Sequence, residues 1–234
     1  MQIKKYRDEE GLFIVEGRKS VLELLQSDFE IECVYSTQIY KNEITGSQYL
    51  QPKIEIVTVA ELEAISRIES NNSMLAVAKM KKQEAFSYKN TTKVLILDFI
   101  QDPGNLGTII RTADWFGIET IICSQNTVDF YNPKVITATM GSFVRVKIGY
   151  FDLLPEIQKL KESHFTIYGA LLQGDNLRKV IPANKFALII GNESNGIDVK
   201  IQNMIDKSIT IEKFGKAESL NASVAAGIIL QHFC

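Results

Sequence analysis

Polar side chains and glycines gather in three segments that border apolar runs. The segments are DPGNLGTIIRTADWFG at 102–117, GNESNGID at 191–198 and IEKFGKAESLNASVAAGI at 211–228. In open α/β sheets, ligands bind outside the carboxyl ends of the strands, so loops of this kind can converge on one pocket. The sequence therefore predicts a single ligand site that draws on all three segments.

The first segment combines a turn with a helix that carries a cation. Pro103 and Gly104 favour a turn, and Asn105 can cap the helix that follows. Arg111 stands in that helix among aliphatic residues. By spacing alone, the favoured interpretation is a structural arginine paired with a carboxylate such as Asp98 or Asp114, because buried charges are usually paired. A functional guanidinium is the other interpretation.

The second and third segments supply a carboxylate, hydroxyls and amides. Glu193 follows a strand where a nucleotide phosphate would be repelled, and the phosphate-binding patterns GxxxxGK[ST] and GxGxxG are both absent. Taken alone, this segment is a polar turn before a helix. In the third segment, Ser219 or Asn221 can cap a helix of small residues. Taken alone, it is the start of a tightly packed helix.

Two α/β regions are predicted to position these segments. Residues 1–85 show helical spacing at 20–26 and 60–68, and apolar strands at 31–35, 54–57 and 74–78. A polar stretch at 81–93 has no strong periodicity and is the best linker candidate. From residue 94, continuous aliphatic strands alternate with helices, which favours a parallel sheet covered on both faces.

Composition excludes several classes of protein. The chain has 234 residues, 45% of them hydrophobic and 23% charged, which is typical of a folded globular protein. No apolar run reaches the length of a membrane-spanning helix, so no membrane partner and a cytoplasmic location are expected. Three separated cysteines and two histidines show no metal-binding spacing, so no metal is expected.

The net charge of −2 weighs against a nucleic-acid partner, because RNA-binding surfaces are usually basic. Short basic clusters remain within that balance. They are Lys4, Lys5 and Arg7; Arg18 and Lys19; and Lys79, Lys81 and Lys82. Each is more typical of a solvated face than of a phosphate site.

Together and in this order, the three segments resemble the signature motifs of the SpoU/TrmH family of SPOUT-class RNA 2′-O-ribose methyltransferases. The matching patterns are NLGxxxRxAxxFG, GNExxG and ESLNxSVA, and the stretch NPKVITATMGSFVRV at 132–146 also resembles a family segment. The resemblance covers about residues 92–234. FIVEGRKSVLELL near the amino terminus is similar, more loosely, to the ribosomal-protein-like domain that many members carry in front.

The resemblance implies an α/β fold in two parts. A small substrate-binding domain at 1–85 precedes a parallel-sheet methyltransferase domain at 92–234, which ends in a deep C-terminal trefoil knot. It also implies a homodimer, with the active site completed near the dimer interface. The implied reaction transfers a methyl group from S-adenosylmethionine to a ribose 2′-hydroxyl. The implied partner is structured RNA, with ribosomal RNA ahead of transfer RNA.

The resemblance also assigns roles to individual residues. The matching catalytic residues are Arg111, Asn105, Glu193, Ser219 and Asn221. The matching cofactor-binding residues are Leu171, Gly191, Ile211 and Leu220. Family members usually use the arginine as a base, but a guanidinium pKa above about 12 suits stabilisation of an alkoxide or a phosphate better.

The chain departs from the family pattern at two positions, where Glu212 replaces a common proline and Thr137 a common arginine. The second change bears on substrate identity and RNA-binding strength more than on catalysis. Two alternatives stay open beside the main interpretation. One is a SPOUT enzyme that acts on another RNA atom, and the other is a non-catalytic RNA-binding or assembly protein with this fold. A generic nucleotide-binding protein is the weakest choice.

Overall fold

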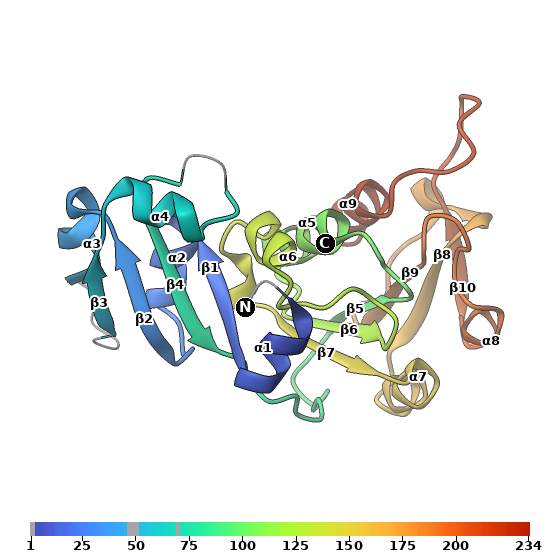
Figure 1. Cartoon of the computed structure of the whole chain (residues 1–234). Helices are drawn as coiled ribbons and strands as arrows, with labels where there is room; N and C mark the ends of the chain where they lie inside the picture. Colours follow the sequence, from blue (N-terminus) through green and yellow to red (C-terminus); the bar gives the residue numbers. More distant parts are fainter. Residues whose placement is uncertain (1–2, 46–51, 69–70) are drawn as a thin grey trace. The chain divides into compact units, whose positions relative to one another are not determined.

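The computed structural model describes residues 3–45, 52–68 and 71–234 (Figure 1). The chain forms two compact units. The first contains residues 1–82 together with 129–144, and the second contains residues 83–128 and 145–234. In the described ranges, no helix has both the length and the apolar character needed to span a membrane.

The first unit is built on a four-stranded sheet with the order β1-β4-β2-β3. The strands are β1 (Leu12–Glu16), β2 (Ile31–Ser36), β3 (Lys53–Ile56) and β4 (Met74–Lys79). Strand β4 runs antiparallel to β1 and β2, whereas β3 is parallel to β2. The three strands expected from the sequence are present, but β1 was not expected. Its residues read LFIVE, and the strand is completed by pairing along its length with β4.

The helices of the first unit come from both of its segments. They are α1 (Lys4–Glu10), α2 (Arg18–Leu25), η1 (Gln38–Tyr40), α3 (Lys41–Thr45), α4 (Val59–Ile65), α6 (Pro133–Ala138) and η2 (Ser142–Val144). Helix α4 begins with a capping box between Thr58 and Glu61. Such reciprocal hydrogen bonds satisfy two otherwise free N–H groups at a helix start.

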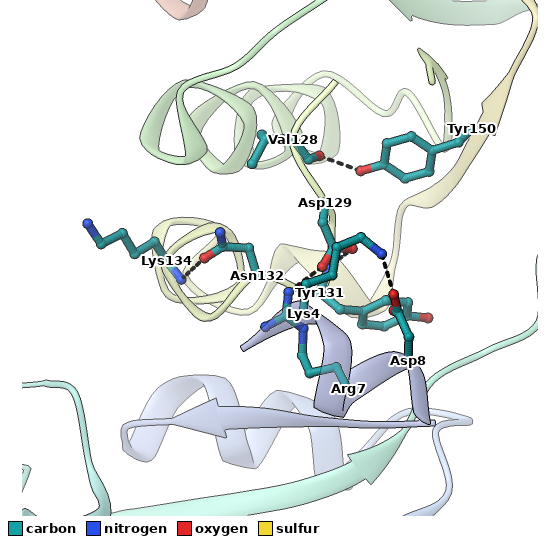
Figure 2. A network of polar contacts seen from close by, with 9 residues as sticks. All are labelled: Lys4, Arg7, Asp8, Val128, Asp129, Tyr131, Asn132, Lys134 and Tyr150. Atoms are coloured by element: carbon teal, nitrogen blue, oxygen red, sulfur yellow. Dashed lines mark hydrogen bonds and ion pairs between the residues drawn. The ribbon is translucent and has the colours of Figure 1, made fainter. Parts of the chain in front are cut away.

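Segment 129–144 is integrated into the first unit by aromatic and ionic contacts. The ring of Phe143 is fully buried and lies 6.2 Å from that of Phe13 and 6.0 Å from that of Phe29. Figure 2 shows the buried Arg7 of α1 beside Asp129, with Nη2 2.5 Å from the carboxylate. The hydrophobic core of this unit therefore includes residues of segment 129–144 as well as residues from the start of the chain.

The second unit contains a six-stranded parallel sheet with the order β10-β8-β9-β5-β6-β7. The strands are β5 (Lys93–Leu97), β6 (Thr120–Ser124), β7 (Lys147–Phe151), β8 (Thr166–Asn176), β9 (Phe186–Ile190) and β10 (Lys207–Thr210). The predicted parallel sheet is confirmed. Sequence order reverses at β5, which has β6 on one side and β9 on the other. Ligand sites of α/β sheets lie at such a point.

Helices cover both faces of this sheet. They are α5 (Pro103–Trp115), α7 (Leu153–Glu162), η3 (Leu177–Lys179), α8 (Val199–Gln202) and α9 (Ala222–Phe233). Ile157 of α7 and Ile201 of α8 pack in one core cluster with Val94 and Ile96. Since side chains alternate along a strand, Leu95 points to the opposite face, where α5 and α9 lie (Figure 1). The predicted knot is not tested by these observations and stays a prediction.

Candidate functional site

The start of α5 differs from the expected capping pattern. Asp102 is the N-cap, and its carboxylate accepts the N–H of Asn105 at 2.8 Å. Pro103 occupies the first turn, where its missing N–H costs no helical hydrogen bond. The prediction that Asn105 caps α5 is therefore wrong. Because Asp102 has that task, the Asn105 side chain is free for contacts outside its own helix.

Asn105 connects all three motifs. Its amide nitrogen donates a hydrogen bond to the Glu193 carboxylate, and its amide oxygen accepts one from Nδ2 of Asn221 at 2.8 Å. Asn221 caps α9, because its Oδ1 accepts the N–H groups of Ser223 and Val224 at 2.9 and 3.3 Å. The relay Asn221–Asn105–Glu193 thus links residues that are far apart in the sequence.

Glu193 is carried by a tight turn at the end of β9. The backbones of Asn192 and Gly196 exchange two hydrogen bonds of 3.0 and 2.9 Å. A Cβ atom at Gly191 would lie 2.4 Å from the Gly196 carbonyl carbon, so only glycine fits at this position. The Asn192 side chain binds the turn internally and also donates to the carbonyl of Phe99 at 2.9 Å.

The loop after β5 forms a hydrogen bond with the residues that follow this turn. Asp98 is buried, and its carboxylate accepts the N–H of Asp198 at 2.8 Å. Burial raises the pKa of Asp98, while the hydrogen bond from Asp198 acts in the opposite direction. Phe99 has a left-handed backbone with φ of 62°, and its N–H donates to the Ser124 hydroxyl at 2.8 Å. Sequence reasoning missed this support, although a carboxylate directly after an aliphatic strand was an available signal.

Arg111 lies apart from the relay. It is exposed, and among the described residues it has no ion-pair partner. Asp114 binds Arg145 at 2.9 Å, and Asp98 binds backbone, so neither carboxylate pairs with Arg111. The favoured interpretation of a buried structural pair was therefore wrong. Since α5 turns by about 100° per residue, Arg111 points to a different side of the helix from Asn105.

Ser219 is also outside the relay. It is exposed two residues before Asn221, and its hydroxyl makes no hydrogen bond within the described ranges. The structure thus brings together three of the five predicted catalytic residues. Both Arg111 and Ser219 are accessible to a ligand or to a second chain.

The predicted cofactor residues lie within β8, directly after β9 and β10, and in the loop before α9. The register between β8 and β10 shifts, because Ser208 pairs with Gly169 but the next residue, Ile209, pairs with Asp175. Residues 170–174 of β8, which include Leu171, therefore form a bulge. Gly191 directly follows β9, and Ile211 directly follows β10. Leu220 is partly exposed near the end of the loop that joins β10 to α9.

Residues 212–220 of that loop are exposed and form no hydrogen bond with other described residues. Their backbone N–H and C=O groups can therefore form hydrogen bonds with a ligand. A ligand that covers these groups must provide such bonds, because buried backbone groups need hydrogen-bond partners. In the described part of the chain, no group of three or more potential metal ligands occurs.

A cavity of about 390 Å³ opens at the carboxyl ends of β5 and β6, beside the turn after β9. Asp98, Ser124, Asn126 and Asn195 supply its polar lining. None of the five predicted catalytic residues lines this cavity. The cavity lies at the same edge of the sheet as the relay, but no residue of the relay lines it.

Comparison with known proteins places these features in one family. Residues 92–231 match the model of the SpoU rRNA Methylase family, and residues 1–76 match the MRM3-like substrate binding domain. The first match covers more than half of the chain. The protein belongs to the SpoU rRNA methylase family.

Individual relatives extend over nearly the whole chain. The 23S rRNA (guanosine(2553)-2′-O)-methyltransferase RlmP of Bacillus subtilis is 32% identical over 99% of this chain and 92% of its own length. The structure of an AdoMet-bound rRNA methyltransferase from Sinorhizobium meliloti matches with a TM-score of 0.85 and 26% identity, covering 99% of this chain and 90% of that one. A TrmH-family protein from Porphyromonas gingivalis matches with a TM-score of 0.88 and 28% identity, covering 99% and 93%.

Proposed function

We propose that this protein transfers the methyl group of S-adenosylmethionine to a ribose 2′-hydroxyl of ribosomal RNA. The observation that carries the proposal is the relay in which Asn105 joins Glu193 to Asn221. It unites all three motifs at the sheet edge where α/β proteins bind ligands. The B. subtilis relative, whose name specifies a guanosine 2′-O position of 23S rRNA, supports this substrate class.

In this proposal the cofactor lies against Leu171, Gly191, Ile211 and Leu220. Bound there, S-adenosylmethionine supplies an activated methyl group on a sulfonium. Loop 212–220 offers unpaired backbone groups, and Gly191 leaves no side chain in the way. The AdoMet-bound S. meliloti structure supports the cofactor assignment. We propose that no metal takes part.

The residues of the relay have separate tasks in the reaction. A bond would form between the ribose oxygen and the methyl carbon as the sulfur–carbon bond breaks, which would leave a neutral thioether and release the hydroxyl proton to solvent. Asn105 orients the Glu193 carboxylate, which is an acceptor group for hydroxyl hydrogen bonds. Holding reactants in line can supply much of the acceleration in such a transfer. Arg111 is not part of the relay, and in the dimer proposed below it contributes a fixed positive charge for the developing alkoxide or a neighbouring phosphate.

The exposed position of Arg111 supports a homodimer as the active form. Trp115 stands one turn further along α5 and is 83% exposed, while Val224 and Ile228 of α9 are 49% and 40% exposed. Helices α5 and α9 are neighbours, because Asn221 bonds Asn105 and Gly227 lies beside Thr112. A second copy on this apolar face would cover it and place its own groups near Arg111. A second copy would also place its groups near the exposed Ser219 hydroxyl.

We further propose that the domain at 1–85 binds the RNA substrate, that residues 92–234 form the methyltransferase domain with its knot, and that the protein acts in the cytoplasm. The match of residues 1–76 to a substrate binding domain supports the first part. Structured RNA is the partner, and ribosomal RNA is favoured over transfer RNA.

The deciding experiment maps ribose methylation. The gene is deleted in its host, 2′-O-methyl marks are mapped across total RNA, and the strain is complemented with wild type, Arg111→Ala or Arg111→Lys. Loss of one ribosomal mark that only wild type restores is the expected result. A lost base methylation would support an enzyme acting on another atom. No lost mark, together with no binding of S-adenosylmethionine by the purified protein, would support a non-catalytic RNA-binding role.

A further inference from the structure

Loop 211–221 carries an exposed aromatic ring that no part of the proposed reaction uses. The side chain of Phe214 is 80% exposed. Transfer of a ring this size from water to a contact surface is favourable, so a largely exposed phenylalanine indicates a surface that meets a partner when it stands beside groups of matching chemistry. The neighbours of Phe214 decide which partner fits.

Those neighbours are cations. Lys213 and Lys216 flank the ring in sequence, are exposed and form no ion pair with any described residue. From η3, the guanidinium carbon of Arg178 lies 6.0 Å from the centre of the Phe214 ring. Glu212 is as close to Phe214 in sequence as Lys216, and Glu218 is four residues away, so the three cations Lys213, Lys216 and Arg178 outnumber the single near carboxylate. Positive charge therefore gathers at the aromatic residue itself.

The loop also lies close to the reaction site along the chain. Phe214 precedes Asn221 by seven residues, and Asn221 bonds Asn105 of the relay. Because residues 212–220 make no hydrogen bond within the described ranges, few contacts hold the loop in one position. It can therefore adjust to a polymer whose ribose is placed at the relay.

From this arrangement we propose that Phe214 is a stacking platform for an unpaired base of the RNA substrate, with Lys213, Lys216 and Arg178 beside its phosphates. Unpaired bases stack on aromatic rings and guanidinium planes, whereas paired bases are not accessible for such contacts. Stacking does not depend on net positive charge. It explains how a chain of net charge −2 can hold RNA.

This inference rests on the proposed RNA substrate. Its test uses the full-length protein and two fluorescently labelled RNAs, a short unstructured oligonucleotide and a fully paired duplex, with anisotropy measured at several salt concentrations. Phe214→Ala should weaken binding of the unstructured RNA by roughly 5- to 100-fold at every salt concentration. Phe214→Trp should retain binding, and the duplex should respond little to either change.

The lysines should act differently from the ring. Replacing Lys213 and Lys216 by Gln should lower the slope of log affinity against log salt by about 0.7 for each lysine that contacts a phosphate. Ile181→Ala is the matched control, because Ile181 is 87% exposed and aliphatic and cannot stack. It should leave both RNA affinities unchanged.

Three results would overturn the proposal. The first is unchanged RNA binding by Phe214→Ala. The second is a loss of S-adenosylmethionine affinity by calorimetry while RNA affinity stays the same, which would make Phe214 a cofactor cover. The third is a loss of RNA binding that merely follows a loss of dimer in light scattering. A wild-type protein that binds the RNA but methylates none would refute the proposed function. The comparison of RNA affinity between wild type and the Phe214 variants would still test the stacking proposal.

Discussion

The side-chain amide of Asn105 uses both of its ends, the nitrogen toward Glu193 and the oxygen toward Asn221. A single side chain can join two motifs in this way only because Asp102 caps the helix in its place. Removing the amide would separate Glu193 from the rest of the relay. Whether the replacing side chain can ionise then decides how the activity of the site responds to pH.

Asn105→Asp should lower the rate of methyl transfer by about 100-fold near neutral pH, because two facing carboxylates cannot both ionise without repulsion. Part of the activity should return as the pH falls, since a protonated carboxyl regains a donor toward its neighbour. Single-turnover rates at several pH values measure this. Asn105→Ala is the control and should show no recovery in acid. A flat pH response of Asn105→Asp would contradict the facing arrangement.

The substitution Asp98→Asn tests how the buried carboxylate affects the pH dependence of folding stability. Burial raises the folded-state pKa of Asp98 above its ordinary value of 3.8. Between those two values the folded chain binds more protons than the unfolded chain, so Asp98 makes stability fall as the pH rises. The melting temperature of the Asn variant relative to wild type should therefore improve from about pH 3 to neutral pH. A difference that is constant or declines with pH would show that Asp98 is not destabilised by its burial.

At the scale of elements, the site depends on how strand ends and helix starts meet. The turn after β9 is tied to the loop after β5 by Asp98 and by Phe99, whose left-handed backbone brings its carbonyl to Asn192. A non-glycine residue with positive φ persists where surrounding contacts determine it. In contrast, residues 212–220 of the loop after β10 form no hydrogen bond with any residue that the structure describes. One part of the site is preorganised, and the other can be ordered by ligands.

Gly191→Ala should disrupt the preorganised part. The new methyl group would lie 2.4 Å from the Gly196 carbonyl carbon, and its nearest neighbours are backbone atoms of Gly196 and Ile197, which cannot rotate away as a side chain could. The expected cost is about 1–3 kcal/mol, with a lower melting temperature and weaker S-adenosylmethionine binding. Gly215→Ala is the matched control in the loop after β10, because a Cβ atom there meets nothing within 4 Å. Equal effects of the two substitutions would contradict this distinction.

At the scale of the whole molecule, the chain passes between the two units at residues 82/83, 128/129 and 144/145. The segment between β6 and β7 thus contributes to the core of the amino-terminal unit, with Ile136 and Phe143 fully buried there. A fragment of residues 83–234 would lack β1 and α2 and would expose these side chains. The two units are therefore not independent in folding, although each has its own sheet.

The fragment 83–234 should bind a hydrophobic dye and aggregate more than the full-length chain. Light scattering and dye fluorescence at equal concentrations measure this. Replacing Ile136 and Phe143 in the fragment by Ser should reduce both signals, because those residues would be the exposed ones. A monomeric fragment with no dye binding would show that segment 129–144 folds without the amino-terminal unit.

The dimer proposal gives a prediction at the same scale. Ile228→Glu should shift the purified protein toward monomer in light scattering, because burying an unpaired carboxylate in an apolar interface costs several kcal/mol. Methyl transfer should fall in parallel. Ile39→Glu, on an equally apolar but unrelated exposed position of the first unit, is the control. A monomeric wild-type protein with full activity would refute the dimer.

The sequence by itself determined the motifs and most of the sheet. Aliphatic strands such as VLIL and FALII are recognisable because strands buried on both faces need no polar alternation. Strands β1, β7 and β10 were not expected, since short runs such as KSIT and KIGYF contain polar or glycine residues and are stabilised by pairing with neighbours. Local propensity carries no information about such pairing.

Only the tertiary structure decided which motif residues meet. Sequence spacing suggested that Asn105 caps its helix and that Arg111 pairs with a buried carboxylate, and both expectations were wrong. Capping depends on which of several nearby polar residues reaches the free N–H groups, and burial of an arginine depends on what packs over the helix. Likewise, the placement of residues 129–144 in the first unit follows from long-range contacts of Phe143 and Arg7. Contacts between residues distant in sequence arise only when the whole chain has folded.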